Sequence, residues 1–263
     1  MIGEAGYIDV AQIVLYVFWA FFAYLVFHLQ QESRREGFPL EDEAGNISGP
    51  DAIFTPKAKT FHLPHGHGTV TVPNDNARDN MRDDVKLEPV SRFAGTAFRP
   101  GGDDPMKAGV GPGAWTQRSE HPDLTAHGDV KIVPMRVGTE FTVPKQNIDP
   151  RGLRVVGHDG VVAGTVADIW CDRAEQVVRY YEVALDDAIG EGSVLIPANF
   201  AAIKPIRGRE VLCFVDSIKG GQFANVPRTA AADQVTFREE DQIMGYYGAG
   251  LFYSDPSRHE VKL

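Results

Sequence analysis

The sequence has few cysteines and no excess of positive charge, and both features exclude classes of protein. Only two cysteines, Cys171 and Cys213, occur in 263 residues. Two are too few for a disulfide framework or a four-cysteine zinc site, and we interpret them as buried thiols. The net charge is −10. Because a nucleic-acid-binding surface needs a basic face, we expect no nucleic-acid partner.

Recognisable catalytic motifs are also missing. The sequence has no phosphate-binding loop, no dinucleotide fingerprint and no nucleophile–base pair, so we expect a protein that is not an enzyme. Glycine (27 residues) and proline (17 residues) are plentiful. This composition favours many turns and short strands over a helical bundle.

One long apolar run stands near the N-terminus. Residues 11–29 read AQIVLYVFWAFFAYLVFHL, and only Gln12 and His28 interrupt the run. As a helix it spans about 30 Å, the thickness of the hydrocarbon core of a bilayer. The run is apolar on every face, unlike an amphipathic surface helix. The sequence therefore predicts a transmembrane helix over residues 11–31.

The charges on either side of this helix predict its orientation. Glu4 and Asp9 precede it with no Lys or Arg, whereas Arg34 and Arg35 follow it directly. The positive-inside rule then puts the C-terminal mass in the cytoplasm. The acidic start and the lack of a cleavage site favour a retained anchor over a signal peptide. We expect Arg34 and Arg35 to meet lipid headgroups, although snorkelling at a helix end explains them equally well.

Two regions follow the anchor. Residues 32–115 have no long periodic segment and one strand candidate, Thr69–Val72. We interpret them as extended chain lying on a partner's surface, with disorder as the alternative. Short strand-like runs then alternate with turns, which predicts a small antiparallel barrel or sandwich. The expected strands are 153–156, 161–170, 177–185, 193–196 and 211–214, with a tight turn at 158–160.

A single helix is predicted near the C-terminus. Thr236 and Glu239 form a capping box, and two further acids follow directly. Capping explains this acid cluster without a metal or catalytic role. Gly248 and Gly250 are expected to end the helix.

Three sets of polar residues are candidates for chemistry. The first, His62, His65 and His67, is a possible metal site, but no acid or cysteine stands near it, and we favour turn histidines that face water or a partner. The second set is suited to collecting protons but equally fits a solvated loop. The third contains a possible ion pair, Glu175 with Arg179, if its stretch is helical. The second and third sets are His121, Asp123, His127 and Asp129, and Asp168, Asp172, Glu175 and Arg179.

Several specific strings occur in one order along nearly the whole chain, and together they carry a resemblance. They include IDVAQIVLYVFWAFF, ESRREGFPLEDE, KTFHLPHGHGTVTVP, GTVADIWCDRAEQ, RYYEVAL and REEDQIMGYYGAGLFY. In these strings the sequence resembles the H subunit of the photosynthetic reaction centre of purple bacteria.

The resemblance implies a single-pass protein of the inner (intracytoplasmic) membrane. Its expected parts are a periplasmic tail (1–10), the transmembrane helix (11–31), the extended segment (32–115) and a cytoplasmic domain (116–263). The fold class is a single N-terminal transmembrane α-helix plus a mainly β domain. That domain is a PRC-barrel-like small antiparallel barrel with one short C-terminal helix.

The resemblance also implies partners and cofactors. The family caps the cytoplasmic face of the L and M subunits, stabilises the secondary quinone site and helps carry protons to it. The complex contains bacteriochlorophyll, bacteriopheophytin, quinones, non-haem iron and carotenoid, none of them bound by this chain alone. Light-harvesting antenna polypeptides, a cytochrome subunit and membrane phospholipids are further expected partners.

Proton-transfer residues carry over position by position. His127 matches the first of the family's surface histidine pair, but Asp129 stands at the second position, and the acid that precedes the pair is Thr125 here. His65 matches a histidine that lines the same entry region. The resemblance implies that transition metals bound at the histidine pair inhibit proton entry, and these departures put that inhibition in doubt for this chain. Asp129 is still able to relay a proton.

The inner end of the expected path lies in the third set. Glu175 matches the family's buried glutamate near the secondary quinone, and Arg179 matches its nearby arginine. We add Asp172 to the proton-transfer candidates. Two other classes of function stay open at this point: a membrane-tethered adaptor, and a metal-dependent enzyme built on the histidine loops.

Overall fold

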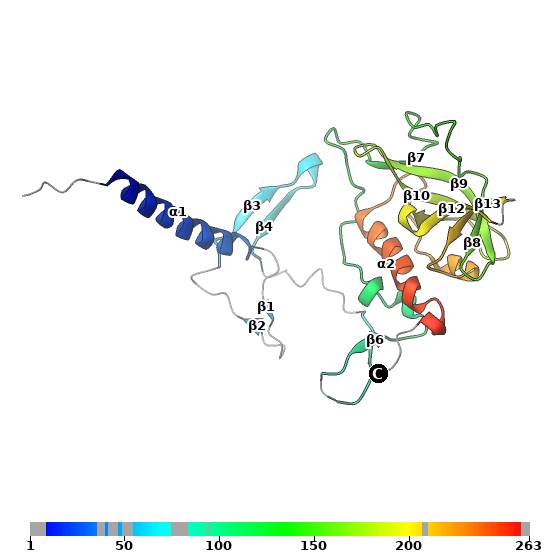
Figure 1. The fold of residues 1–263 in the computed structure, drawn as a ribbon, viewed down its shortest axis with the longest axis horizontal. Coiled ribbons are helices and arrows are strands. Elements are labelled where there is room, and N and C mark those ends of the chain that lie inside the picture. The colour runs from blue at the N-terminus through cyan, green and yellow to red at the C-terminus, as the bar shows by residue number, and fades with distance from the viewer. Residues whose placement is uncertain are drawn as a thin grey trace, which may run out of the picture. The chain divides into compact units, whose positions relative to one another are not determined.

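The structure is a computed structural model of the chain. It describes residues 9–35, 40–41, 47–48, 55–74, 84–93, 95–206 and 210–258. The chain forms two compact units, Met1–Asn80 and Met81–Leu263, and Figure 1 labels most of their helices and strands.

The first unit begins with the predicted apolar helix, α1 (Val10–Glu32). The Asp9 carboxylate caps it by accepting hydrogen bonds from the backbone N–H groups of Ala11 and Gln12. None of the helix residues is buried. By length and composition α1 is able to cross a membrane, and the apolar side chains that it exposes are those that lipid would cover.

Among the described residues of the first unit, two short hairpins follow α1. β1 (Leu40–Glu41) pairs with β2 (Ile47–Ser48), and β3 (Lys59–His62) pairs with β4 (Thr69–Val72). The predicted strand at 69–72 is confirmed, whereas β3 was not predicted. Arg35 connects the end of α1 to the chain just before β3, because its Nη1 donates to the Lys57 carbonyl at 2.6 Å.

The second unit is built around one curved sheet in the order β11–β10–β9–β8–β13–β12, with β7 paired to β9. All pairs are antiparallel except β8 with β13. The strands are β7 (Ile132–Pro134), β8 (Arg154–Gly157), β9 (Val162–Asp172), β10 (Val177–Leu185), β11 (Ser193–Pro197), β12 (Ala201–Ile206) and β13 (Glu210–Val215). A separate ladder joins β5 (Leu87–Pro89) to β6 (Phe98–Pro100).

All five strands predicted for this unit are present, and the turn at 158–160 joins β8 to β9 as predicted. Four strands of the unit were missed: β5, β6, β7 and β12. β12 contains Pro205, which argues against a central strand, but β12 lies at the sheet edge, where proline is tolerated. Short 3₁₀ turns occur at Pro64–Gly66, Pro105–Lys107, Gly111–Gly113, Ala198–Phe200, Gly220–Asn225 and Pro256–Arg258.

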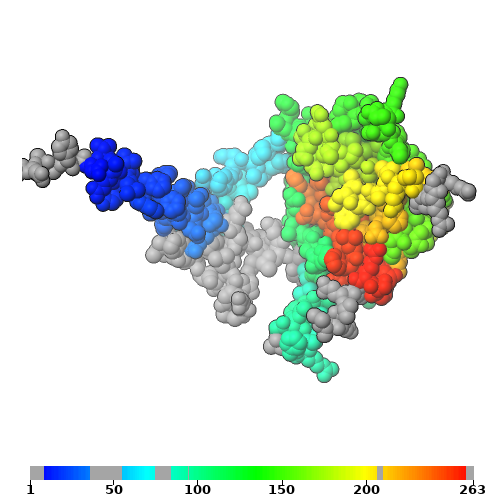
Figure 2. All heavy atoms as spheres, in the orientation of Figure 1, coloured from blue at the N-terminus to red at the C-terminus, as the bar shows by residue number. Residues whose placement is uncertain are grey.

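The core lies between the sheet and α2 (Phe237–Tyr253). Trp170 and Phe223 are fully buried there, and Tyr247 of α2 packs against Phe223 and Phe200. Figure 1 shows α2 beside the strands, and Figure 2 shows the red C-terminal part of the chain next to the yellow residues near 200. The expected extended segment, 32–115, is divided between the two units, and Met106 from its end joins this core.

The capping box of α2 is confirmed, but the predicted helix end is wrong. Thr236 Oγ1 accepts from the Glu239 N–H, and the Glu239 carboxylate accepts from the Thr236 N–H. The helix continues through Gly248 and Gly250 to Tyr253. Both glycines serve packing, since a Cβ atom would lie 2.6 Å from the Pro112 carbonyl oxygen at Gly248 and 2.6 Å from that of Ser217 at Gly250.

We therefore expect Gly250→Ala to destabilise the protein although alanine is the better helix former. The added methyl group would meet Ser217 and the Ile218 side chain, and such overpacking costs about 1–3 kcal/mol, more than the gain in helix propensity of about 1 kcal/mol. Gly221→Ala is the matched control, because nothing lies within 4 Å of its Cβ position. Denaturant unfolding of the detergent-solubilised chain measures both. Equal stability of the two variants would contradict this packing role.

Candidate functional site

The site is built on a buried carboxylate at the end of β9. The Asp172 residue is 0% exposed, and a charge in that position needs hydrogen-bonding partners. Its Oδ1 accepts from the backbone N–H groups of Ala174 and Glu175, both at 2.9 Å. Its Oδ2 accepts from Arg179 Nε and Nη2 at 3.2 and 3.1 Å, and Lys131 Nζ lies 3.6 Å away.

These bonds create the turn between β9 and β10. An aspartate that accepts from the N–H groups two and three residues ahead bends the chain sharply. The turn closes when the Gln176 N–H donates to the Asp172 carbonyl at 2.8 Å, with Gln176 at a φ of 54°. Asp172 therefore shapes the turn with one oxygen and binds cations with the other.

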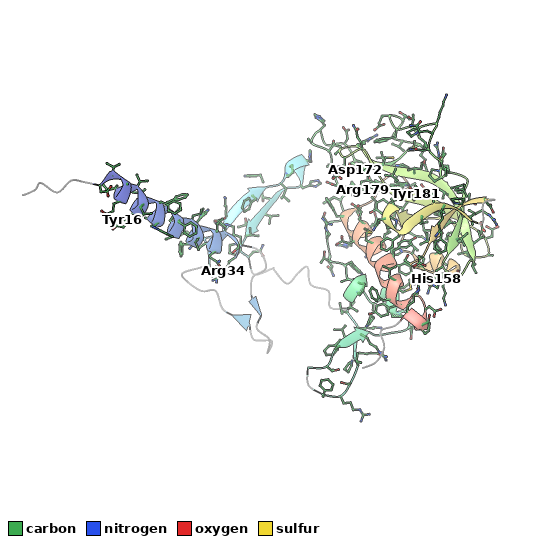
Figure 3. All side chains as sticks on the ribbon, viewed as in Figure 1. Tyr16, Arg34, His158, Asp172, Arg179 and Tyr181 are labelled. Carbon is green, nitrogen blue, oxygen red and sulfur yellow. The ribbon has the colours of Figure 1, made fainter. Side chains whose placement is uncertain are left out.

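Arg179 reaches this turn because of a bulge in β10. Val178 pairs with Cys171 and Tyr180 with Trp170, so Arg179 has no partner on β9. A bulge of this kind changes the direction of a side chain. Figure 3 shows Asp172 and Arg179 close together in the second unit. The sequence contains no obvious signal for this bulge.

Glu175 lies at the exposed tip of the turn. Its side chain is 54% exposed in this chain, and it pairs with Arg179 at 2.7 Å and with Lys131 at 3.5 Å. The expected Glu175–Arg179 ion pair is present, although the stretch is a turn and a strand rather than a helix. The family's glutamate is expected to be buried, but no element in the part of the chain that the structure describes covers Glu175.

The second histidine and acid set lies on a neighbouring hairpin. The ion pairs around Asp172 form a cluster of four residues, Asp172, Glu175, Arg179 and Lys131, which we call the Asp172 cluster. The base of the hairpin contacts this cluster, because Asp123 Oδ2 lies 3.1 Å from Lys131 Nζ. Its tip is closed by Thr125, whose N–H donates to the Asp129 carbonyl at 2.8 Å. His127 and Asp129 are exposed at this tip. One hairpin thus carries exposed titratable groups at its tip and Lys131, which the sequence analysis missed, at its root.

Charges around Asp172 favour its ionised form. Burial by itself raises the pKa of Asp172, but the Glu175 N–H, the Arg179 guanidinium, the Ala174 N–H and the Lys131 ammonium together hold it below its usual value. The Asp123 carboxylate in turn raises the pKa of Lys131. The cluster therefore holds fixed cations among several carboxylates.

Other candidates lie elsewhere. Asp168 does not join Asp172 but binds Arg136 at 3.1 Å, and Glu182, its cross-strand partner, binds the same guanidinium at 2.5 Å. Two acids at paired positions of neighbouring strands need a cation between them. The sequence could therefore have predicted a bridging cation once these strands were paired. Trp170 Nε1 also donates to Glu182. These contacts stabilise the pairing of β9 with β10.

The remaining candidates belong to the first unit. His65 is exposed in the turn between β3 and β4, at a φ of 58°. Among the residues that the structure describes, no group of three His, Cys, Asp or Glu side chains is placed to hold a metal. Arg34 and Arg35 follow α1 directly (Figure 3 labels Arg34). Arg35 is bound by Glu32 through Nε at 2.6 Å and Nη2 at 2.8 Å.

An apolar groove of about 280 Å³ borders the turn in the second unit. Gln176, Val177 and Val178 form one part of its wall, and Phe141 and Ile148 form another. Val177 and Ile148 are exposed. The turn with Glu175 is thus flanked by apolar surface.

These features define a class of protein: a PRC-barrel-domain protein with one N-terminal helix that is able to span a membrane. A PRC-barrel domain model matches residues 148–218, which include β8 to β13. A second model, described as the photosynthetic reaction centre H-chain N-terminal region, matches residues 4–137, more than half of the chain.

The chain belongs to the photosynthetic reaction-centre H-chain family. Members of this family are subunits of an electron-transfer complex. Family membership implies the L and M subunits as partners and a complex with pigments and quinones.

We expect Asp172→Asn to lower the free energy of unfolding at pH 7 by about 2 kcal/mol, because it removes the buried carboxylate to which the partly exposed Arg179 donates and beside which Lys131 lies. Asparagine keeps the acceptor for the two turn N–H groups. The folded-state pKa of Asp172 lies below the unfolded value, so its stabilisation is present above about pH 4 and is lost as the pH falls further. The difference between variant and wild type should therefore shrink in acid.

The control for this prediction is Asp149→Asn, which removes an exposed pair with Arg151 and should cost less than about 1 kcal/mol. Denaturant unfolding at several pH values measures both variants. A loss at Asp172 no larger than at Asp149 would show that the buried carboxylate does not organise the turn.

Proposed function

We propose that the chain caps the cytoplasmic face of the L and M subunits, stabilises the secondary quinone site and conducts protons from the cytoplasm to the reduced quinone. The observation that carries this proposal is the Asp172 cluster, in which a buried carboxylate, two cations and an exposed glutamate adjoin in a chain of this family.

The chemistry of the quinone requires such a cluster. A doubly reduced quinone takes up two protons at a site that is closed to bulk water. Carboxylates, histidines and waters at hydrogen-bonding distance relay protons when their pKa values lie within reach of the ambient pH. Glu175 suits the inner end of a relay, because its carboxylate is held by Arg179 and remains open to a partner surface.

The hairpin at 121–131 suits the outer end. His127 and Asp129 are exposed to solvent at its tip, and Asp123 at its root contacts Lys131 of the cluster. Histidine changes charge near neutral pH and is therefore a suitable proton collector. We include His65 of the first unit in the entry region on the family pattern alone.

The proposed arrangement also assigns surfaces. The apolar groove beside Glu175 would lie against L or M, so that the partner buries Glu175. α1 would span the inner membrane with its N-terminus in the periplasm. Arg34 would meet lipid headgroups, whereas Arg35 is already bound by Glu32 and is suited to holding the hairpin root.

We assign the bacteriochlorophyll, bacteriopheophytin, carotenoid, quinones and non-haem iron of the complex to its other subunits. Antenna polypeptides and a cytochrome subunit complete the proposed surroundings.

We predict that Glu175→Gln slows the second, proton-coupled electron transfer by roughly tenfold or more, while the complex still assembles. Glutamine keeps the shape of the side chain but is unable to bind a proton. Flash-induced absorbance changes of the purified complex measure the rate.

Glu140→Gln is the matched control, since Glu140 is 49% exposed and binds Arg173 at 2.8 Å, much as Glu175 binds Arg179. The control should leave the rate unchanged. If Glu175→Gln has wild-type kinetics, Glu175 does not belong to the proton path.

A further inference from the structure

A second acid lies behind the cluster, at the start of α2. Glu240 Oε2 accepts a hydrogen bond from the Tyr180 hydroxyl at 2.8 Å. Tyr180 is 4% exposed and directly follows Arg179 on β10. Neither residue belongs to the entry or quinone ends of the proposed path.

Helix capping does not explain the position of Glu240. Glu239 supplies the capping carboxylate, which accepts from the Thr236 N–H at 2.8 Å. The Glu240 side chain instead points its carboxylate at a tyrosine on a buried strand, where its ionised form is less well solvated. A partly buried acid without a capping role calls for another explanation.

The groups facing Glu240 come from three parts of the second unit. β10 supplies Tyr180 and Arg179, the 121–131 hairpin supplies Asp123, and the segment before it supplies Arg118. Asp241 follows Glu240 on α2 and binds Arg118 at 3.2 Å. Arg179 and Asp123 both also belong to the Asp172 cluster, so Glu240 shares two charged neighbours with it.

The balance of these charges favours proton binding at Glu240. Burial raises the pKa of Glu240, and the Tyr180 hydroxyl, Arg179 and Arg118 only partly offset this while Asp123 adds to it. Burial also raises the pKa of Tyr180, so its phenol stays protonated and acts as a fixed donor.

We propose that Glu240 is a partly buried proton-binding residue, which is coupled through Arg179 to Asp172 and Glu175 and stores a proton beside the proposed path. The carboxylate takes up one proton from water and returns one, with no change of oxidation state. This inference rests on the proposed function for its role, whereas the proton-binding site itself is measurable in the dark.

The test is an infrared titration of the purified complex in the dark, which follows the C=O stretch of protonated carboxyl groups. Glu240→Gln should remove one titrating carboxyl, whereas Glu191→Gln, in the exposed turn between β10 and β11, should leave the buried band unchanged. An unchanged titration in the Glu240 variant would overturn the proposal.

A second pair of variants tests the hydrogen bond without removing the acid. Tyr180→Phe should shift the Glu240 midpoint to higher pH by roughly one unit, because the ionised form loses its donor, and should also move the C=O band. Tyr181→Phe is the control, since Tyr181 faces the groove of about 280 Å³. A band that is identical in both variants would remove Tyr180 from the site.

The coupling has its own readout. Glu175→Gln releases Arg179 from one carboxylate, so Glu240 should hold its proton less tightly and its midpoint should move to lower pH. Glu140→Gln should not move it. A shift in the dark together with unchanged flash kinetics would retain the proton site and reject the proposed conduction, whereas no shift would reject the coupling.

Discussion

The burial of one carboxylate determines the arrangement of the candidate site. Asp172 ends the longest strand of the sheet inside the protein, where an unpaired charge is strongly unfavourable. Its two oxygens meet this cost in different ways, one by closing the turn to β10 and the other by binding Arg179. The position of Glu175 follows from the turn, the bulge in β10 brings Arg179 to the carboxylate, and the neighbouring hairpin brings Lys131.

The second unit contains two sets of ion pairs, one structural and one at the candidate site. Arg136 binds Asp168 and Glu182 on paired strands, and Trp170 is a further donor to Glu182. This set stabilises the sheet. The Asp172 cluster differs because it opens at an exposed glutamate and adjoins a hairpin with exposed titratable residues. A cluster that connects the interior with the surface is the arrangement that proton transfer needs.

Most of the fold was predictable because its signals are local. Uniform apolarity marked α1, alternation and turn residues marked the main strands, and Thr236 with Glu239 marked the start of α2. The end of α2 was not predictable, because Gly250 is explained by its contact with Ser217, thirty-three positions earlier in the chain. Tertiary contacts of this kind leave no periodic pattern in the sequence.

The candidate site was predictable only in part. The resemblance pointed to Glu175 and Arg179, and spacing grouped them with Asp172, but it also grouped Asp168, which faces a different cation. The bulge at Arg179 and the approach of Lys131 depend on sheet register and on a separate hairpin. The pairing of Tyr180 with Glu240 joins residues sixty positions apart and has no local signal.

The most direct test of the account is an experimental structure of the complex that this chain forms with its partner subunits. We predict that the 172–179 turn lies against the membrane subunits, with Glu175 buried and linked through side chains or waters towards the secondary quinone. A turn that faces bulk water, with Glu175 as exposed as in the chain alone, would contradict it.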